Sequence, residues 1–442
     1  MAARVGWRER LARGGYSALL ALLPPAYLLR LWRRGRLEPL YRHALGERFG
    51  RYDARAPALR GAVWIHAVSL GETRAAAALV GALRELRPDL RLLLTHGTAT
   101  GREAGAALLD ATPQPDGLPH DLQVWLPFDT AAATRRFIAR FRPAVGILME
   151  TELWPNLLHA AARAGVPTVL ANARLSARSE RRGRRLDAVM RPAVASLALV
   201  LAQTEDDARR LVERGARAVE VCGNLKFDMT PDPALLERGR AWRRVLGRPV
   251  VLAASTRDGE EAPLLAAWRA ESRAPRPLLL IVPRHPQRFD GVAALVEQAG
   301  FAVARRSAFA DGGPGSAALA ADVWIGDSMG EMPLYYAAAD VALLGGSFGR
   351  FGGQNLIEAA ACGCPVVMGP HTWNFAEAAE LALVAGAAQR VADPGEGVRR
   401  ALTLTQPEAR APLQQGAQRF AERHRGAARR MAERIAALLS PA

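Results

Sequence analysis

From residue 60 onward, short apolar runs alternate along the chain with stretches in which apolar residues recur every three or four positions. The longer patterns predict helices at 72–86, 130–141 and 204–215. Regular alternation of strand and helix is typical of a parallel sheet with helices on both faces. The short runs predict buried strands at 62–69, 90–95, 123–127, 144–149, 168–171 and 197–202.

A second series of the same kind follows a breaker cluster, Met-Thr-Pro-Asp-Pro, at residues 229–233. We therefore expect an α/β protein with two doubly wound Rossmann-like lobes, in which a ligand binds at strand carboxyl ends facing a cleft. Strands of the second series are predicted at 250–254, 278–282, 301–304, 323–325, 341–344, 365–368 and 389–391. The expected segments are 1–40, a first lobe at 41–228, a linker at 229–245, a second lobe at 246–409, and a C-terminal amphipathic helix or helix pair within 410–442.

The first forty residues differ from this pattern. Residues 14–29 are uncharged, with Arg8, Arg10 and Arg13 before them and four arginines just after them. A membrane-spanning helix needs about 20 apolar residues, and the prolines at 24 and 25 would kink this one. We expect an anchor whose arginines meet anionic lipid, either as a short span or as a helix lying in the interface. An ordinary buried N-terminal helix is the alternative.

Composition narrows the class of protein. The 442 residues carry a formal charge of +16, and Lys226 is the only lysine among 59 basic side chains. Half of the residues are hydrophobic, which excludes a disordered chain. Cys222, Cys362 and Cys364 are too few and too clustered for a disulfide framework, so a reducing compartment is expected. The charge names no partner by itself, because coding bias also produces arginine-rich chains.

Acidic side chains follow two strands of the first lobe. Glu72 comes after the strand at 62–69, and Glu150 and Glu152 follow the strand at 144–149. Carboxylates at such strand ends suit a general base, or a group that binds a sugar hydroxyl. Each has a structural alternative, since an acid near a helix start also complements the helix dipole.

The lone lysine lies in Gly-Asn-Leu-Lys-Phe-Asp, residues 223–228, just before the breaker cluster. Lysine differs from arginine in offering a compact point charge, which suits a single developing anionic oxygen. We interpret Lys226 as functional from its position and its rarity. Chance retention of one lysine is the alternative.

Three strand ends of the second lobe carry groups that suit an anionic ligand. Arg284 and His285 follow one strand, and residues 327–331 follow another. A Gly-rich turn at 345–353 then leads into a helix whose Glu358 could reach ribose hydroxyls. The chain lacks both the Rossmann glycine pattern and the Walker lysine motif, so NAD and ATP are disfavoured and a nucleotide sugar is expected.

Metal ligation is not expected. Cys362 and Cys364 have no second cysteine pair nearby, so packing is the favoured interpretation. His66 lies within an apolar strand and is expected to be a core residue, whereas His96 at a strand end is left open.

Several segments in order resemble one family. Ser-Leu-Gly-Glu at 69–72, Met-Glu-Thr-Glu-Leu-Trp-Pro-Asn at 149–156 and Gly-Asn-Leu-Lys-Phe-Asp at 223–228 resemble the 3-deoxy-D-manno-octulosonic acid (Kdo) transferases of Gram-negative bacteria. The resemblance extends to Pro-Arg-His-Pro at 283–286, Asp-Ser-Met-Gly-Glu at 327–331 and the Gly-rich segment at 345–367. The family, glycosyltransferase family 30 or lipid IVA Kdo transferases, consists of two-lobed GT-B enzymes with an N-terminal anchor.

The resemblance implies an inverting transfer of Kdo from CMP-Kdo to the lipid A precursor in lipopolysaccharide synthesis, at the cytoplasmic face of the inner membrane and without a metal or other cofactor. It makes Glu72 the general base and gives Glu150 and Lys226 transition-state roles, with Glu152 as the alternative to Glu150. The expected partners are the acceptor, the donor and anionic lipid, without nucleic acid. Residues expected to hold CMP are Arg284, His285, Met329, Gly330, Glu331, Asn355, Leu356, Ile357 and Glu358.

Residues 112–121 form an insertion relative to the family pattern, and we expect a surface loop there. The nearest rival function is another GT-B enzyme that uses a UDP-sugar, of the lipid A disaccharide synthase or epimerase type. A membrane-associated nucleic-acid-binding protein is a rival of another class. This alternative lacks support, because the sequence shows no basic motifs interleaved with aromatic residues and no known nucleic-acid-binding module.

Overall fold

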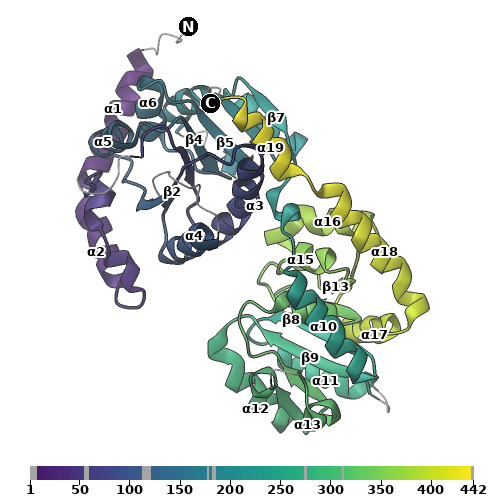
Figure 1. Cartoon of the computed structure of the whole chain (residues 1–442). Helices are drawn as coiled ribbons and strands as arrows, with labels where there is room; N and C mark the ends of the chain where they lie inside the picture. Colours follow the sequence, from purple (N-terminus) through teal and green to yellow (C-terminus); the bar gives the residue numbers. More distant parts are fainter. Residues whose placement is uncertain are drawn as a thin grey trace. The chain divides into compact units, whose positions relative to one another are not determined.

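A computed structural model describes residues 7–53, 59–111, 121–176, 179–181, 186–272, 276–310 and 313–439 (Figure 1). The predicted insertion falls almost wholly outside these residues, in 112–120. The chain divides into two compact units, one of Met1–Asp228 with Arg425–Ala442 and one of Met229–His424.

The first unit is built on a parallel sheet of seven strands in the order β3-β2-β1-β4-β5-β6-β7. Because β2 and β3 lie on one side of β1 and the later strands on the other, the order reverses between β1 and β4. Open α/β sheets bind ligands at the carboxyl end of such a switch point. The strands are β1 (Val63–His66), β2 (Leu92–His96), β3 (Leu122–Trp125), β4 (Val145–Met149), β5 (Thr168–Ala173), β6 (Leu199–Ala202) and β7 (Val219–Val221).

Alternate residues of these strands feed two separate cores. Val63 and Ile65 of β1 pack in a cluster with side chains of α3 and α19, whereas Trp64 packs with those of α5 and α6. Successive side chains point to opposite faces of a strand, so apolar residues at every position bury both faces of the sheet. The remaining elements of the unit are α1 (Trp7–Leu22), α2 (Pro24–Arg34), α3 (Leu70–Leu86), α4 (Ala99–Ala111), α5 (Ala131–Phe141), α6 (Pro155–Arg163), α8 (Asp187–Ala195), α9 (Glu205–Glu213), α19 (Ala427–Ala436) and the 3₁₀ turns at Pro39–Arg42, Leu45–Phe49 and Leu225–Asp228.

The second unit repeats this design with a parallel seven-stranded sheet in the order β10-β11-β9-β8-β12-β13-β14. Its switch point lies between β8 and β12. The expectation of two doubly wound α/β lobes is thus confirmed. The strands are β8 (Val250–Thr256), β9 (Leu278–Pro283), β10 (Val303–Arg305), β11 (Val323–Ile325), β12 (Val341–Leu344), β13 (Val366–Met368) and β14 (Ala388–Arg390). The helices are α10 (Pro233–Leu246), α11 (Glu261–Glu271), α12 (Phe289–Gln298), α13 (Ser316–Ala320), α14 (Met332–Ala338), α15 (Leu356–Ala361), α16 (Ala376–Val384), α17 (Pro394–Leu404) and α18 (Pro407–His424), with 3₁₀ turns at Pro286–Arg288, Arg306–Ala308 and Trp373–Phe375.

The structure shows how the predicted linker and the C-terminal segment are folded. The segment expected as a linker, 229–245, is largely the helix α10, which packs on α14 within the second unit. The C-terminal segment divides into α18, in the second unit, and α19, which packs on α3 in the first. The carboxylate of Asp228 accepts backbone N–H bonds from Gly426 and Ala428 and so fixes the start of α19.

The apolar N-terminal run is divided between two helices. Pro24 and Pro25 open α2, where prolines fit because no intrahelical N–H bond is lost, and Leu23 separates α2 from α1. Tyr16 and Ser17 of α1 hydrogen-bond to Asp129 and Asn156, so α1 is docked on the first unit. Among the described residues, no helix combines the length and the apolar character that crossing a bilayer requires. The structure therefore shows no spanning anchor helix.

Candidate active site

Glu72 lies in the first turn of α3, directly after β1. Its carboxylate accepts hydrogen bonds from the Val68 backbone N–H at 2.8 Å and from Ser69 Oγ at 3.0 Å. Ser69 caps the helix in return, in an arrangement that differs from a capping box because Glu72 takes the N–H of Val68 and not that of the N-cap residue Ser69. Burial raises the pKa of Glu72, although the bonds from Val68 and Ser69 oppose this rise. A carboxylate that is partly withdrawn from water and has a raised pKa suits a general base.

Glu150 and Lys226 form an ion pair beside Glu72. Glu150 Oε1 lies 3.2 Å from Lys226 Nζ, in a geometry that falls short of a hydrogen bond. Both charges act on the pKa of Glu72, so the three predicted catalytic side chains of the first unit lie together. The backbone of Glu150 has a φ of +53°, which is a strained conformation for a non-glycine residue. Residues strained in this way cluster at functional sites.

Glu152 is the third acid of this cluster, because the charges of Glu72 and Glu150 both act on it. Its Oε2 accepts a hydrogen bond from Trp154 Nε1 at 2.9 Å and lies 4.0 Å from His66 Nε2. Burial, followed by the charge of Glu72, raises the pKa of Glu152 to about 7. The structure thus separates the two candidate acids: Glu150 faces the lysine, and Glu152 faces an indole and an imidazole.

Three amide side chains, two of them buried, hold the loop of Lys226, and the sequence reasoning did not single them out. Asn172 Oδ1 accepts from the Leu225 N–H at 3.0 Å, and Asn224 Oδ1 accepts from the Lys226 N–H at 3.0 Å. Gln203 links the two, because its side chain bonds both Asn224 and the Asn172 carbonyl. Asn172 has a φ of +52° within β5, and an asparagine directly after the strand predicted at 168–171 was the available signal.

The two histidines near the end of β1 are neutral groups in the wall of the site. His66 is fully buried, and burial lowers its pKa to about 3. His96 Nδ1 donates to the Ala67 carbonyl at 2.9 Å, and burial lowers the pKa of His96 to about 4. The expectation that His66 is a core residue is confirmed by its burial.

In the second unit, one buried carboxylate organises the Gly-rich turn after β12. Glu260 accepts backbone N–H bonds from Gly346 at 2.7 Å, Gly349 at 2.9 Å and Phe348 at 3.2 Å, and from Arg257 at 2.8 Å. This side chain ties the loop after β8 to the loop after β12, across the switch point of the sheet. The sequence reasoning missed it, because its role depends on a loop about 90 residues further along the chain.

Cationic groups surround the loop after β9. Arg284 and His285 are exposed there. Partial burial, together with the nearby charges of Arg257, Arg284 and Arg288, lowers the pKa of His285. Arg288 is held by Glu261 at 2.7 Å, which leaves Arg257, Arg284 and His285 as the groups able to meet an anion.

The predicted nucleotide-binding residues that follow β11 are Met329, Gly330 and Glu331. Met329 is 62% exposed and Gly330 has a φ of +81°, so both lie in an open turn. Burial opposes ionisation of Glu331, but bonds from Ser328 and Arg306 outweigh it and lower its pKa.

The α15 residues are less accessible. Leu356 and Ile357 are buried, so only their backbone could meet a ligand, and the Ile357 N–H already bonds Asn355 Oδ1 at 3.2 Å. Glu358 lies in the first turn of the same helix. The order β11-β9-β8-β12 places the loops that carry all of these predicted residues side by side on one edge of the sheet.

The cysteines offer no metal centre. Cys364 is buried, and burial raises the pKa of the Cys362 thiol to about 12. Within the part of the chain that the structure describes, no group of three or more His, Cys, Asp or Glu side chains could hold a metal ion.

Comparison with known proteins places these features in a family. A family model described as 3-Deoxy-D-manno-octulosonic-acid transferase (kdotransferase) matches residues 43–229. The chain is 50% identical over 430 residues to a 3-deoxy-D-manno-octulosonic acid transferase of Bordetella pertussis, covering 95% of this chain and 98% of the relative. It is 35% identical over 424 residues to the transferase of the same description from Haemophilus influenzae, covering 94% and 96%.

Solved structures show the same fold at low sequence similarity. A UDP-GlcNAc 2-epimerase from Neisseria meningitidis bound to UDP-GlcNAc gives a TM-score of 0.55, covering 85% of this chain and 99% of that chain at 15% identity. At this identity the likeness concerns the two-lobed fold and not the reaction.

Proposed function

The chain belongs to the Kdo transferase family of glycosyltransferases, and from this premise we propose that it moves Kdo from CMP-Kdo to the lipid A precursor, lipid IVA, with inversion and without a metal. The observation that carries the proposal is the 50% identity to a Kdo transferase over 95% of the chain. The cluster of Glu72, Glu150 and Lys226 at a switch point supports it, since this is the chemistry that an acceptor hydroxyl requires.

Glu72 is the proposed general base. Its carboxylate takes the proton of the acceptor hydroxyl, the hydroxyl oxygen attacks the anomeric carbon of Kdo, and the bond from that carbon to the phosphate oxygen of CMP breaks. The raised pKa of Glu72 makes it a stronger base than an exposed glutamate. Its bonds from Val68 and Ser69 fix the direction from which it can accept the proton.

Glu150 and Lys226 are proposed to stabilise the transition state as a pair. Lys226 brings a compact positive charge to the site, and Glu150 holds that charge 3.2 Å from its own Oε1. Glu152 is proposed to be about half protonated at pH 7, because its pKa is raised to about 7. In its neutral form Glu152 adds no negative charge beside Glu72.

The second unit is proposed to bind the CMP part of the donor. Arg284, His285 and Arg257 offer the cationic groups for its single phosphate, and the Glu260-supported Gly-rich turn offers backbone groups. These groups supply the positive charge that the departing monophosphate needs. Transfer in the presence of EDTA at the untreated rate is expected, and loss of transfer that is restored by a divalent ion would contradict the metal-free mechanism.

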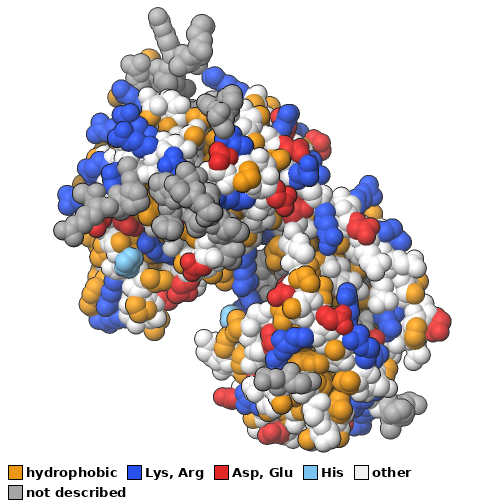
Figure 2. All heavy atoms as spheres, in the orientation of Figure 1, with side chains coloured by type: hydrophobic (Ala, Val, Ile, Leu, Met, Phe, Trp, Pro, Cys, Tyr) orange, Lys and Arg blue, Asp and Glu red, His pale blue; other side chains and the backbone are white. Residues whose placement is uncertain are grey.

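We also propose that α1 and α2 attach the enzyme to the cytoplasmic face of the inner membrane by lying in its interface. Leu22 is 77% exposed, Leu19 59% and Leu29 50%, and arginines accompany them in the sequence. Figure 2 shows hydrophobic and basic side chains mixed on the face of the first unit that carries α2. Such a surface suits anionic lipid. Phosphatidylglycerol vesicles should sediment wild-type protein much better than Leu22→Glu protein, and equal sedimentation would contradict this attachment.

Donor binding distinguishes the proposed function from that of a UDP-sugar enzyme. CMP should raise the thermal unfolding midpoint of the protein, whereas UDP at the same concentration should leave it unchanged. The opposite pattern would favour the UDP-sugar alternative.

A further inference from the structure

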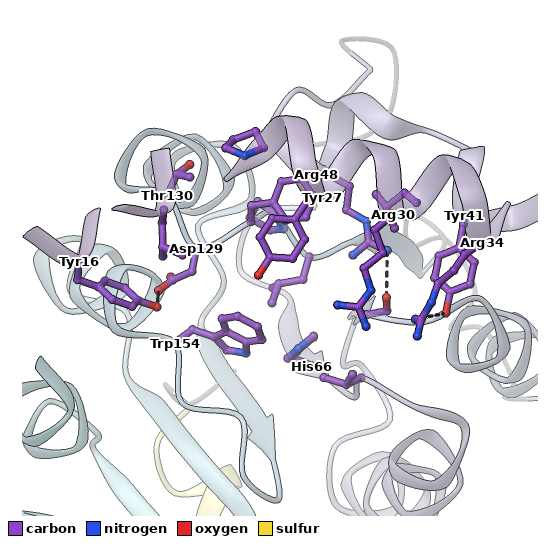
Figure 3. A pocket seen from close by; sticks show the side chains of 18 residues that line it. Tyr16, Tyr27, Arg30, Arg34, Tyr41, Arg48, His66, Asp129, Thr130 and Trp154 are labelled. Atoms are coloured by element: carbon purple, nitrogen blue, oxygen red, sulfur yellow. Dashed lines mark hydrogen bonds between the residues drawn. The ribbon is translucent and has the colours of Figure 1, made fainter. Parts of the chain in front are cut away.

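The first unit contains a cavity to which the proposed mechanism assigns no role. Its volume is about 350 Å³, and it lies between the α1–α2 helices and the loops that follow β1 and β3 (Figure 3). Its walls are largely apolar and aromatic. They include Leu20, Tyr27 and Leu31 from the helices and Leu126, Phe128 and Trp154 from the sheet side.

Arginines stand along one side of this cavity. Arg30 and Arg34 extend from α2 toward it (Figure 3), and Arg48, which also lines it, donates to the Gly97 carbonyl at 3.1 Å. Arg34 reaches the Tyr41 hydroxyl at 3.4 Å, while no carboxylate of the described residues pairs with Arg30 or Arg34. The cavity thus combines an apolar body with cations that are available to an anion.

The cavity also presents an unsatisfied polar atom. His66 lines it and is fully buried, with Nδ1 bonded to Thr95 at 3.0 Å. Its other ring nitrogen, Nε2, has no hydrogen-bond partner among the described residues. Glu152 Oε2 lies 4.0 Å from this nitrogen, so His66 connects the wall of the cavity to the acidic cluster.

Two residues of the cavity wall hold the acidic cluster. The Val68 backbone donates to Glu72 Oε2 at 2.8 Å, and Trp154 Nε1 donates to Glu152 Oε2 at 2.9 Å. Both Val68 and Trp154 line the cavity. A molecule bound in the cavity would therefore contact Val68, a residue that hydrogen-bonds directly to the proposed base.

We propose that this cavity binds one acyl chain of the acceptor lipid, with Arg30 and Arg34 meeting an acceptor phosphate at its mouth. The proposal rests on the proposed function and names the part of the acceptor that the first unit recognises. A volume of about 350 Å³ is near the lower limit of small-molecule pockets, roughly 300–1,000 Å³, and too small for a whole acylated disaccharide. A single chain fits the apolar walls, and the phosphate fits the unpaired arginines.

Burial of the chain would contribute to acceptor affinity. Each methylene group that leaves water raises affinity about fourfold, so a few methylenes account for a large share of acceptor binding. The chain would also position the sugar hydroxyl near Glu72. An acceptor without acyl chains should therefore bind weakly and be used with a high KM.

Two substitutions in α2 distinguish a role of the cavity from a role of the exposed surface of the same helix. Leu31 lines the cavity, whereas Leu29 is 50% exposed and does not. In detergent solution, Leu31→Trp should raise the KM for acylated acceptor at least tenfold and leave the kcat/KM for chemically deacylated acceptor unchanged. Leu29→Trp should match wild type with both acceptors. Equal KM values for acylated acceptor in the two variants would overturn the proposal.

A photoreactive acceptor lipid, with a diazirine on one acyl chain, provides a test that needs no variant. In wild-type protein the label should map to α2 or to residues 126–130, and unlabelled acceptor should displace it. Labelling elsewhere, or equal displacement by phosphatidylglycerol, would refute an acceptor subsite, the latter by showing a general lipid contact. If the lipid labels the cavity but the enzyme transfers no Kdo, the proposed function is refuted and the subsite is not. If the enzyme transfers Kdo and both variants behave as wild type, the subsite is refuted and the proposed function is not.

Discussion

The carboxyl edges of the two sheets have the same topology and opposite chemistry. At the edge of the first sheet, three glutamates influence one another and Glu150 pairs with Lys226, and burial raises the pKa of Glu72 and Glu152. At the edge of the second, Arg257, Arg284 and His285 surround glycine-rich loops, and burial with nearby positive charge lowers the pKa of His285. One fold thus supports two electrostatic environments, because the loops and not the strands carry the charged groups.

The difference matches the two ends of a glycosyl transfer. Raised carboxyl pKa values favour taking a proton from an acceptor, whereas a cationic edge favours a departing phosphate. The same difference appears in how the loops are held. Amide side chains fix the Lys226 loop in the first unit, and a single buried carboxylate fixes the Gly-rich turn in the second.

The largest expected effect comes from Glu72→Gln. The glutamine oxygen can still accept the Val68 N–H bond, and its amide N–H can donate to Ser69 Oγ where the carboxylate accepted, so the local arrangement survives while the base is lost. We expect kcat to fall by roughly 10²–10⁴-fold, with CMP affinity unchanged in calorimetry. The exposed Glu103→Gln on α4 serves as the control. Wild-type turnover in Glu72→Gln would reduce Glu72 to a helix cap.

Glu260→Gln should affect the second unit without touching the first. The amide keeps one acceptor oxygen but loses the charge that four backbone N–H groups share. Because hydrogen bonds to charged groups contribute about 1.5–3 kcal/mol, the KM for CMP-Kdo should rise by roughly tenfold or more. Acceptor KM should stay constant, and the exposed Glu380→Gln should change neither value. An unchanged donor KM would contradict the role of Glu260.

Lys226→Arg tests whether the acidic cluster needs a point charge. Arginine keeps the charge but spreads it over a planar group that cannot occupy the same position beside Glu150. We expect kcat to fall about tenfold in steady-state kinetics. Arg217→Lys, an exchange at an exposed position, should have no effect. A wild-type rate for Lys226→Arg would make the lone lysine a coincidence of composition.

The smallest effect concerns stability and pH. The folded protein binds a proton at Glu152 up to about pH 7, whereas an exposed glutamate releases it near pH 4.5. The folded state therefore holds more protons at Glu152 between these values, so this residue by itself lowers the unfolding free energy as pH rises through the window, on the order of 2 kcal/mol. Because the lowered pKa values of buried His66 and His96 act in the opposite direction, the informative quantity is the difference between wild type and Glu152→Gln. Denaturant unfolding should show wild type losing stability relative to this variant between pH 5 and pH 7.5 by about that amount. An identical pH dependence in Glu152→Gln would contradict the raised pKa.

Much of the fold could be predicted from the sequence because apolar periodicity reports burial directly. Every strand of the second sheet was anticipated, but β7 of the first was missed. At the sheet edge, two of its three residues are partly buried and Val221 is exposed, so no buried apolar run marks this strand. The N-terminal run was taken as one element, although the prolines that begin α2 divide it.

The site could be predicted only where residues lie next to a strand end. Glu72, Glu150 and Lys226 carry that local signal, and the fold brings them together. Glu260 and Asn172 act on segments distant in sequence, so only the folded chain reveals their partners. The cavity beside α2 was also beyond sequence reasoning, because its walls come from several separate segments.

The most direct test of the account is the mass of the lipid product. The purified enzyme, incubated with CMP-Kdo and lipid IVA, should yield a lipid heavier by one or more Kdo residues together with free CMP, and Glu72→Gln should yield almost none. Unmodified lipid IVA with wild-type enzyme would contradict Kdo transfer by this protein, and an equal yield of product from Glu72→Gln would contradict Glu72 as the base.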